Sequence, residues 1–257
     1  MNIFQPVGHL WLLFLQALGK IALFIFETIV NMVKPPFYGK MILRQMVEIG
    51  FYSLPVVGLT AIFTGAVLAL QSYTGFSRFN AESSIATVVV ISITRELGPV
   101  LAGLMVAGRV GASIAAEIGT MRVTQQIDAL STLSTNPYRY LIVPRVLAAV
   151  IMLPFLVLIA DIIGVYGGYL VGIHMLDFNA NSYLKSTFDY LEVNDVVSGL
   201  IKAAVFGFII SIMGCYHGFH SKGGAQGVGA ATTNAVVTSS ITILLLNYVL
   251  TSVFFSG

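Results

Sequence analysis

The sequence predicts an all-α integral membrane protein, and three observations lead to this fold class. Hydrophobic residues make up 57% of the 257 residues, charged residues make up only 9%, and the mean hydropathy is +0.90. A soluble domain carries about 25% charged residues, so these few charges cannot cover a water-exposed surface. Charge-poor stretches of about 20 residues, the length that crosses a bilayer, recur along the chain. We expect an N-terminal interfacial amphipathic helix, about five transmembrane helices and one short cytoplasmic helix between the second and third spans.

Residues 1–34 are predicted to form the interfacial helix. Its polar residues are seven, four, seven, four and three positions apart and so share one helical face: His9, Gln16, Lys20, Glu27, Asn31 and Lys34. A narrow polar stripe on an apolar helix favours a position in the membrane interface; an ordinary first spanning helix is the alternative. Pro35 and Pro36 should end this helix, because neither can donate a backbone hydrogen bond.

The five predicted spans follow a short amphipathic lead-in at residues 40–48. They cover residues 51–77, 84–119, 146–175, 196–216 and 235–255. The second span is unusual because Arg95 and Glu96 lie near its middle, where a charge is costly unless it is paired or faces water. In the third span, Gly164, Gly168 and Gly172 recur every fourth residue, a spacing that lets helix backbones approach closely.

The connections between the spans differ in character. The polar segment 120–145 should face solvent and contain one short helix before Asn136 and Pro137. Residues 177–195 are expected to form an acidic loop, and residues 217–229 a glycine-rich turn. Basic residues favour the cytoplasmic side, and a cytoplasmic N-terminus gives eight of them inside against two outside. The inside set is Lys20, Lys34, Lys40, Arg44, Arg122, Arg139, Arg145 and Lys222, and the outside set is Arg78 and Lys185.

Several functions find no support in the sequence. The glycines at 223–229 lack the lysine and the preceding strand of a phosphate-binding loop, so ATP hydrolysis would need another chain. The histidines and the single cysteine, Cys215, form no metal-binding pattern with carboxylates, although His217 and His220 are three residues apart. No catalytic residues and no cofactor are predicted. A net charge of +2 gives no reason to expect a nucleic-acid partner.

The segment Arg95-Glu96-Leu97-Gly98-Pro99 is the most informative. Adjacent residues on a helix point about 100° apart, so one of the two charges can pair inside the protein while the other faces a cavity. A cavity-facing arginine can bind a phosphate group through its fork of donors, and Lys202 on another span is a candidate second cation. The alternative is that Arg95 and Glu96 form a purely structural ion pair.

The chain resembles the MlaE/YrbE permeases, the membrane subunits of bacterial ABC-type phospholipid transporters. The resemblance covers essentially the whole chain. It is carried by Gly65–Tyr73 (GAVLALQSY), Thr94–Pro99 (TRELGP), Ala107–Met121 (AGRVGASIAAEIGTM), Gln126–Leu130 (QIDAL), Asn136-Pro137 and Pro144-Arg145. It implies a single permease domain over residues 1–257, with the interfacial helix at 1–34, the transmembrane bundle at 35–257 and the coupling helix at about 124–136.

The resemblance also implies partners, a location and site residues. The expected partners are a second copy of the chain, a cytoplasmic ABC ATPase subunit, a periplasmic MCE-domain lipid carrier and, in many systems, a STAS-domain protein. The location would be the bacterial inner membrane, and the role would concern outer-membrane lipid asymmetry. Residues that match the wall of a lipid cavity between two copies are Leu68, Tyr73, Arg95, Glu96 and Lys202. Residues expected to contact the ATPase are Gln125, Asp128 and Leu130.

The leading interpretation is therefore a permease subunit that moves phospholipid between the inner membrane and the periplasmic carrier. The alternatives are a permease of the same fold for another amphiphile, such as a sterol or a hydrophobic solvent, and an intramembrane enzyme. This chain has Ala230 and Asn234 where some relatives carry basic residues, which lowers the positive charge expected in the pocket. The resemblance assigns no role to Asp161.

Overall fold

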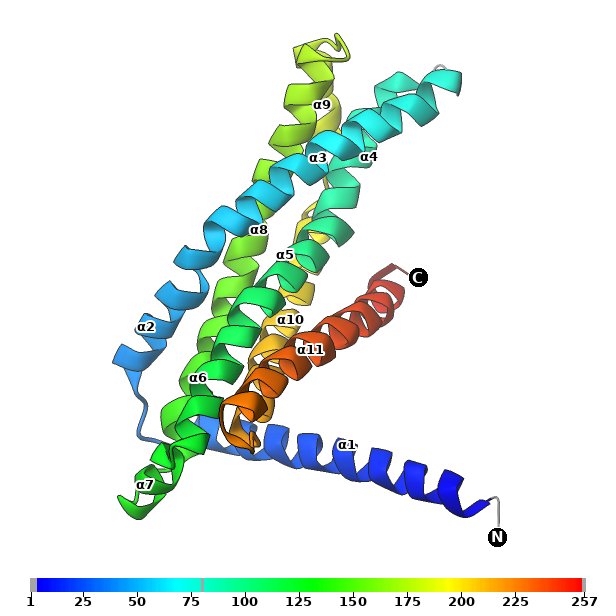
Figure 1. Cartoon of the computed structure of the whole chain (residues 1–257). Coiled ribbons are helices and arrows are strands. Elements are labelled where there is room, and N and C mark those ends of the chain that lie inside the picture. The colour runs from blue at the N-terminus through cyan, green and yellow to red at the C-terminus, as the bar shows by residue number, and fades with distance from the viewer. Residues whose placement is uncertain (1–3, 80, 256–257) are drawn as a thin grey trace.

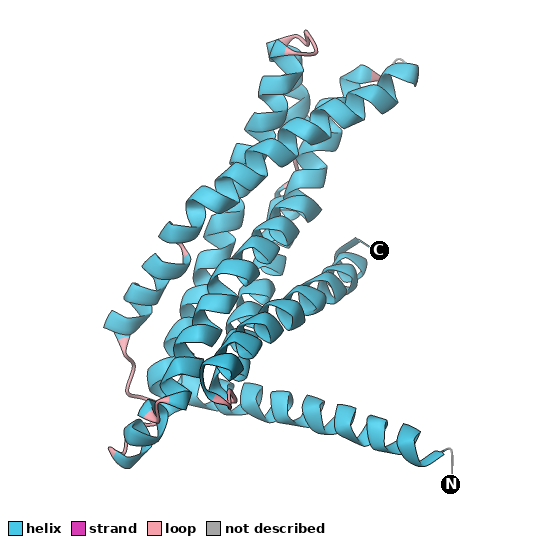
Figure 2. Ribbon diagram, in the orientation of Figure 1, coloured by secondary structure: helices cyan, strands magenta, loops and turns pink. Residues whose placement is uncertain are grey.

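The computed structural model describes residues 4–79 and 81–255, and within these ranges it contains helices and short connections but no strand (Figure 2). The predicted all-α class is confirmed. The α-helices are α1 (Phe4–Val33), α2 (Gly39–Ile49), α3 (Leu54–Phe76), α4 (Ile85–Ser92), α5 (Gly98–Val106), α6 (Ala112–Val123), α7 (Gln126–Thr132), α8 (Val143–His174), α9 (Ala180–Tyr190), α10 (Val193–Phe219) and α11 (Gly224–Phe255). The 3₁₀ turns are η1 (Phe51–Ser53), η2 (Ser77–Phe79) and η3 (Glu82–Ser84), and the π turns are η4 (Ile93–Leu97), η5 (Ala107–Gly111) and η6 (Tyr138–Ile142).

Among the described residues, six helical stretches are long and apolar enough to cross a membrane. They are Leu15–Val33, Gly39–Phe79, Glu82–Val123, Tyr138–His174, Val193–Phe219 and Gly224–Phe255. The first of these belongs to α1, which lies across the end of the bundle where α7 is found rather than along the bundle (Figure 1). This placement supports an interfacial position for α1 and leaves the five stretches predicted as spans for the bundle itself.

Proline positions explain the end of α1 and the start of α3. The helix α1 ends at Val33, directly before Lys34 and the two prolines, as predicted. The amphipathic lead-in forms α2, and the turn η1 joins it to α3. Pro55 lies in the first turn of α3, where a missing backbone N–H leaves no hydrogen bond unmade. The lead-in and the first span therefore follow each other as one nearly continuous helical stretch.

Glycines allow α3 and α8 to pack closely. A side chain on Gly65 would collide with the backbone carbonyl of Gly164, and one on Gly167 would collide with the carbonyl of Ile62. Small residues at such crossings let helix backbones come into contact. The glycine spacing in the third predicted span is thus used for packing within this chain.

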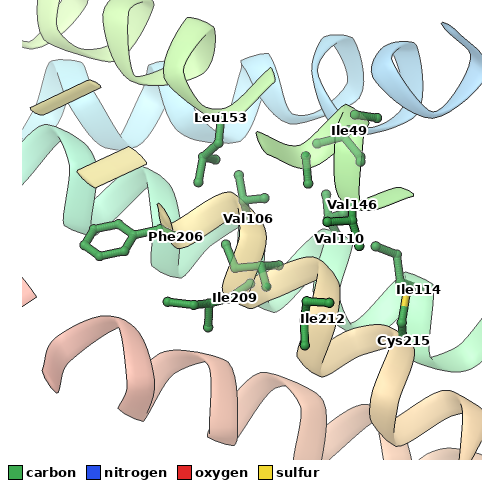
Figure 3. Close-up of a cluster of buried hydrophobic side chains, with 14 of the residues drawn as sticks. Ile49, Val106, Val110, Ile114, Val146, Leu153, Phe206, Ile209, Ile212 and Cys215 are labelled. Carbon is green, nitrogen blue, oxygen red and sulfur yellow. The ribbon is translucent and has the colours of Figure 1, made fainter. Parts of the chain in front are cut away.

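The apolar core lies where α5, α6, α8 and α10 meet, with Ile49 of α2 added at one side (Figure 3). The side chains drawn and labelled there are Ile49, Val106, Val110, Ile114, Val146, Leu153, Phe206, Ile209, Ile212 and Cys215. All ten are buried, and none is more than 7% exposed. The cysteine is buried in this core and acts as one more apolar group.

The segment predicted as an acidic loop contains a helix, so that prediction is wrong in part. The helix α9 occupies Ala180–Tyr190, and the side chain of Asn179 accepts hydrogen bonds from the backbone N–H groups of Asn181 and Ser182 at its N-terminus. Its buried residues are Tyr183 and Thr187, four positions apart and therefore on one face. The cap and this short buried face explain the helix.

Two other boundaries also differ from the prediction. The glycine-rich turn is shorter than residues 217–229, because α10 continues to Phe219 and α11 begins at Gly224. Gly223 and Gly224 have φ values of 88° and 68°, a conformation that suits glycine and reverses the chain. The short helix expected within residues 124–136 is α7, preceded by Gln125 in the left-handed region with φ of 59°.

Candidate functional site: a charged network at the turn η4

Arg95 and Glu96 lie in the π turn η4, which joins α4 to α5 inside the second long helical stretch. π turns inside α-helices are frequent at functional sites, because the extra residue changes the direction of nearby side chains. Each of the three π turns found in the described residues contains an arginine: Arg95, Arg109 or Arg139. No feature of the sequence predicted these turns.

Arg95 is held at one nitrogen and left partly open at the others. Its Nε donates to Oδ1 of Asp195 at 2.6 Å, and its Cζ lies 4.5 Å from the ring centroid of Phe255. The side chain of Asp195 is only 1% exposed, whereas that of Arg95 is 31% exposed. No described residue accepts a hydrogen bond from its two terminal guanidinium nitrogens. Arg95 can therefore still offer its two-nitrogen fork to an anion.

Glu96 and Lys202 form the second ion pair. Nζ of Lys202 donates to Oε1 of Glu96 at 2.8 Å, to the backbone oxygen of Arg95 at 2.9 Å and to Oγ1 of Thr251 at 2.8 Å. Thr251 in turn donates to Oε1 of Glu96, and Nδ2 of Asn247 donates to Oε2, both at 2.8 Å. Lys202 is completely buried. An ammonium group has three donors, so all of them are used inside the chain.

We call this set the Arg95–Lys202 network. Its members come from η4, α10 and α11 and are Arg95, Glu96, Asp195, Lys202, Asn247 and Thr251. Two acids and two bases balance its charge. The structure therefore does not provide the two free cations that the sequence suggested. Arg95 is the accessible cation, and Lys202 fastens η4 to α10 and α11.

Three members of the network were missed from the sequence. Asp195 and Lys202 are seven residues apart, two helical turns, so they lie on one face of α10. An acid and a base on one face of α10 can pair with the base and the acid at positions 95 and 96. This complementarity could have identified Asp195 from the sequence. No charge pattern identified Asn247 and Thr251, because uncharged polar residues such as these are ordinary in a transmembrane helix.

The structure places the other two predicted lipid-binding residues elsewhere. Leu68 and Tyr73, both on α3, pack against a small apolar cluster that includes Ile85 and Val89. The ring of Tyr73 lies 5.9 Å from that of Phe178. Within the described residues, no hydrogen bond or ion pair joins either of them to the Arg95–Lys202 network. Their assignment to a lipid cavity between two copies stays a prediction.

The predicted ATPase-contacting residues all lie at α7. Gln125 is exposed in the turn that precedes the helix, and Asp128 is exposed and accepts from Nη1 of Arg122 at 2.6 Å. Leu130 is half-buried and packs against the apolar core, and Ile127 is fully buried in that core. Leu133, which we did not single out from the sequence, follows the helix and is 75% exposed. The buried residues anchor α7, and Asp128 and Leu133 form its outer surface.

Other ion pairs serve the structure near the same end. Nη2 of Arg145, a buried residue, lies 2.8 Å from Oε2 of Glu117. Arg109 donates to the hydroxyl of Ser53 at 2.9 Å and lies 3.7 Å from Glu48. Within the described part of the chain, no three His, Cys, Asp or Glu residues are grouped so that they could hold a metal ion.

The fold and the site define a class: a polytopic membrane protein that keeps an arginine partly exposed beside a buried charged network. The chain belongs to the MlaE permease family. The family model described as Permease MlaE matches residues 42–253.

Three relatives illustrate the range of this family. A probable ABC transporter permease protein of Rickettsia felis is 66% identical over 255 residues, which is 99% of this chain and 98% of the relative. The intermembrane phospholipid transport system permease protein MlaE of Haemophilus influenzae is 32% identical over 257 residues, or 100% and 98%. The chloroplastic protein TRIGALACTOSYLDIACYLGLYCEROL 1 of Arabidopsis thaliana is 38% identical over 231 residues, or 90% and 66%.

Proposed function

We propose that this chain is the permease subunit of an ATP-driven transporter that moves phospholipid between the bacterial inner membrane and a periplasmic MCE-domain carrier. The observation that supports this most directly is the partly exposed guanidinium of Arg95, which is anchored by Asp195 within a helical stretch long and apolar enough to cross a membrane. A bidentate contact with a phosphate group is the interaction that arginine makes best. The names of the Rickettsia and Haemophilus relatives point to the same transport class.

The proposed assembly contains a second copy of the chain, the ATPase and the MCE-domain protein, with a STAS-domain protein as a further subunit. We assign the ATPase contact to α7, because this short helix projects from one end of the bundle (Figure 1) and exposes Leu133 there. The MCE-domain carrier would approach the opposite end, where α9 lies. We also propose that the N-terminus is cytoplasmic and that α1 lies in the inner-membrane interface.

The test replaces Arg95 by alanine in the assembled transporter and measures phospholipid crosslinking together with the melting temperature. A charge-assisted hydrogen bond contributes about 1.5–3 kcal/mol, so we expect crosslinking of a photoreactive phosphatidylglycerol to fall about tenfold or more. Asp195→Asn weakens the hold on Arg95 and should increase crosslinking. The control is Arg78→Ala, because Arg78 is an exposed arginine of η2 outside the network. Unchanged crosslinking in Arg95→Ala, with a lowered melting temperature, would reduce Arg95 to a structural residue.

A further inference from the structure

A polar cleft of about 760 Å³ lies between α2 and α6, beside the start of α7. This volume falls within the range of about 300–1,000 Å³ that is typical of small-molecule sites. Arg44 and Glu48 of α2 line one side, Ser113 and Glu117 of α6 line the other, and Gln126 is the first residue of α7. We call it the α2–α6 cleft. It shares no residue with the Arg95–Lys202 network.

Both signs of charge face this cleft. Arg44 and Glu48 are four residues apart on α2, and Ser113 and Glu117 are four apart on α6, so each pair shares one helical face. A smaller recess of about 90 Å³ shares Glu48, Ser113 and Glu117 with the cleft and adds Arg109. Two bases and two acids from three separate elements therefore meet around one space.

These charged groups are accessible and keep unused binding capacity. The side chains of Glu48 and Glu117 are 54% and 56% exposed. Glu117 contacts Arg145 through Oε2 only, and Glu48 lies 3.7 Å from Nη2 of Arg109, which is too far for a hydrogen bond. Arg44 is exposed and has no hydrogen bond or ion pair within the described part of the chain. The cleft thus offers an open guanidinium and open carboxylate oxygens.

The outer surface of α2 indicates that the occupant is a lipid. Leu43 and Val47 directly precede Arg44 and Glu48 and are 65% and 54% exposed, so an apolar face lies about 100° around the helix from the charged one. The helix belongs to the stretch Gly39–Phe79, which is long and apolar enough to cross a membrane. A molecule with its polar end in the cleft can therefore lay hydrocarbon chains against this face, whereas a water-soluble ligand would leave the face unused.

The charges also select the headgroup. A phosphate alone would be repelled by Glu48 and Glu117, and an ammonium alone by Arg44 and Arg109. A phosphoethanolamine group carries both charges, so its phosphate can bind the fork of Arg44. Its ammonium has three N–H donors, and oxygens of Glu48, Glu117 and Ser113 can accept them. A choline headgroup has no N–H to donate and matches these acceptors less well.

We propose that the α2–α6 cleft is a second lipid site, which binds the headgroup of a phosphatidylethanolamine while the acyl chains lie against Leu43 and Val47. This site goes beyond the proposed transport function, because it does not use Arg95. Under the proposed orientation the lipid belongs to the cytoplasmic leaflet. Gln126 begins α7, so the headgroup lies next to the proposed ATPase contact.

The test uses the assembled transporter in nanodiscs that contain trace photoreactive phosphatidylethanolamine or phosphatidylcholine with identical acyl chains. Labelled peptides of α2 and α6 are quantified by mass spectrometry. Because a half-exposed ion pair gives only a modest preference, the ethanolamine probe should label these peptides about two- to fivefold more than the choline probe. Glu48→Gln removes the acceptor charge and should bring this ratio to about one. Arg44→Gln should lower labelling by both probes.

Two controls separate the cleft from other sites. Glu82→Gln changes an acid of η3, outside the cleft, in the same way as Glu48→Gln, and it should leave the ratio unchanged. Arg95→Ala should also leave labelling of α2 unchanged. The fate of the phospholipid site at Arg95 is therefore measured separately from that of the cleft.

Four outcomes would overturn the proposal. Equal labelling by the two probes in the unmodified chain would mean ordinary contact with bulk lipid. Stronger labelling by a matched phosphatidylglycerol probe would make the cleft a site for anionic lipid. Competition by soluble glycerophosphoethanolamine at millimolar concentration would identify a free headgroup compound as the ligand. Absence of label from α2 and α6 in the assembled transporter would mean that another subunit fills the cleft.

Discussion

At the scale of single residues, Arg95 and Lys202 carry the same charge but have different tasks. Lys202 is completely buried and donates three hydrogen bonds within the chain, whereas Arg95 keeps its terminal nitrogens open. The difference follows from shape. An ammonium is a compact point charge that a carboxylate, a carbonyl and a hydroxyl can surround, while a planar guanidinium can bind Asp195 through Nε and still present its other edge.

The ion pair between the buried Lys202 and the partly exposed Glu96 gives the first residue-scale prediction. Lys202→Met leaves the carboxylate of Glu96 without its cation, so the free energy of unfolding should fall by about 1–3 kcal/mol. The double variant Glu96→Gln, Lys202→Met removes both charges and should recover a large part of that loss. Unfolding in mixed micelles measures both values. Additive losses in the double variant would show that the two side chains do not act as a pair.

The sequence predicted part of this site and missed the rest for physical reasons. Arg95 and Glu96 were identifiable because a charge within an apolar span must have a partner or a function. The sequence could not tell which of the cations would be buried, since that depends on how α10 and α11 approach η4. Asn247 and Thr251 were missed because uncharged polar residues are common in spans and carry no comparable cost.

At the scale of elements, the long helices were predictable and the short ones were less so. Apolar length identified the spans, since roughly 20 residues are needed to cross a bilayer. The π turns could not be predicted from the sequence, because they depend on how neighbouring helices pack against one turn of the helix. The helix α9 was missed because its inward face consists of little more than Tyr183 and Thr187, too few residues to show a period.

The surface of α7 gives the element-scale prediction. Leu133 is 75% exposed at the end of this helix, whereas Leu130 is half-buried. Leu133→Asp should therefore weaken ATPase association about tenfold without affecting membrane insertion, because it puts a charge into an apolar contact. Leu130→Asp should also lower the melting temperature. Co-purification of the ATPase measures the association.

The matched control for this prediction is Phe79→Asp. Phe79 is 80% exposed and belongs to η2, remote from α7 at the other end of α3. The same change from an apolar to an acidic side chain there should leave ATPase co-purification unchanged. Equal loss in both variants, or no loss in Leu133→Asp, would place the ATPase contact away from the outer surface of α7.

At the scale of the whole molecule, three basic residues from separate parts of the chain belong to elements at one end of the bundle. The helices α1 and α7 and the turn at 220–223 lie at that end, and α9 lies at the other (Figure 1). Lys20 belongs to α1, Arg122 precedes α7 and Lys222 lies in the turn. All three belong to the eight basic residues that the sequence analysis counted on the cytoplasmic side, so the fold gathers charges that are far apart in the chain. The positive-inside rule then predicts that this end is cytoplasmic.

Cysteine labelling in intact cells tests this orientation. In a Cys215→Ser background, which removes the buried native thiol, Thr132→Cys on α7 and Asn181→Cys on α9 introduce exposed thiols at opposite ends of the bundle. An impermeant maleimide admitted through the outer membrane should label Asn181→Cys fully. Thr132→Cys should react only after the inner membrane is permeabilised, because it would lie on the cytoplasmic face with the proposed ATPase. Labelling of Thr132→Cys in intact cells, with protection of Asn181→Cys, would reverse the orientation and move the ATPase contact from α7 to the end that contains α9.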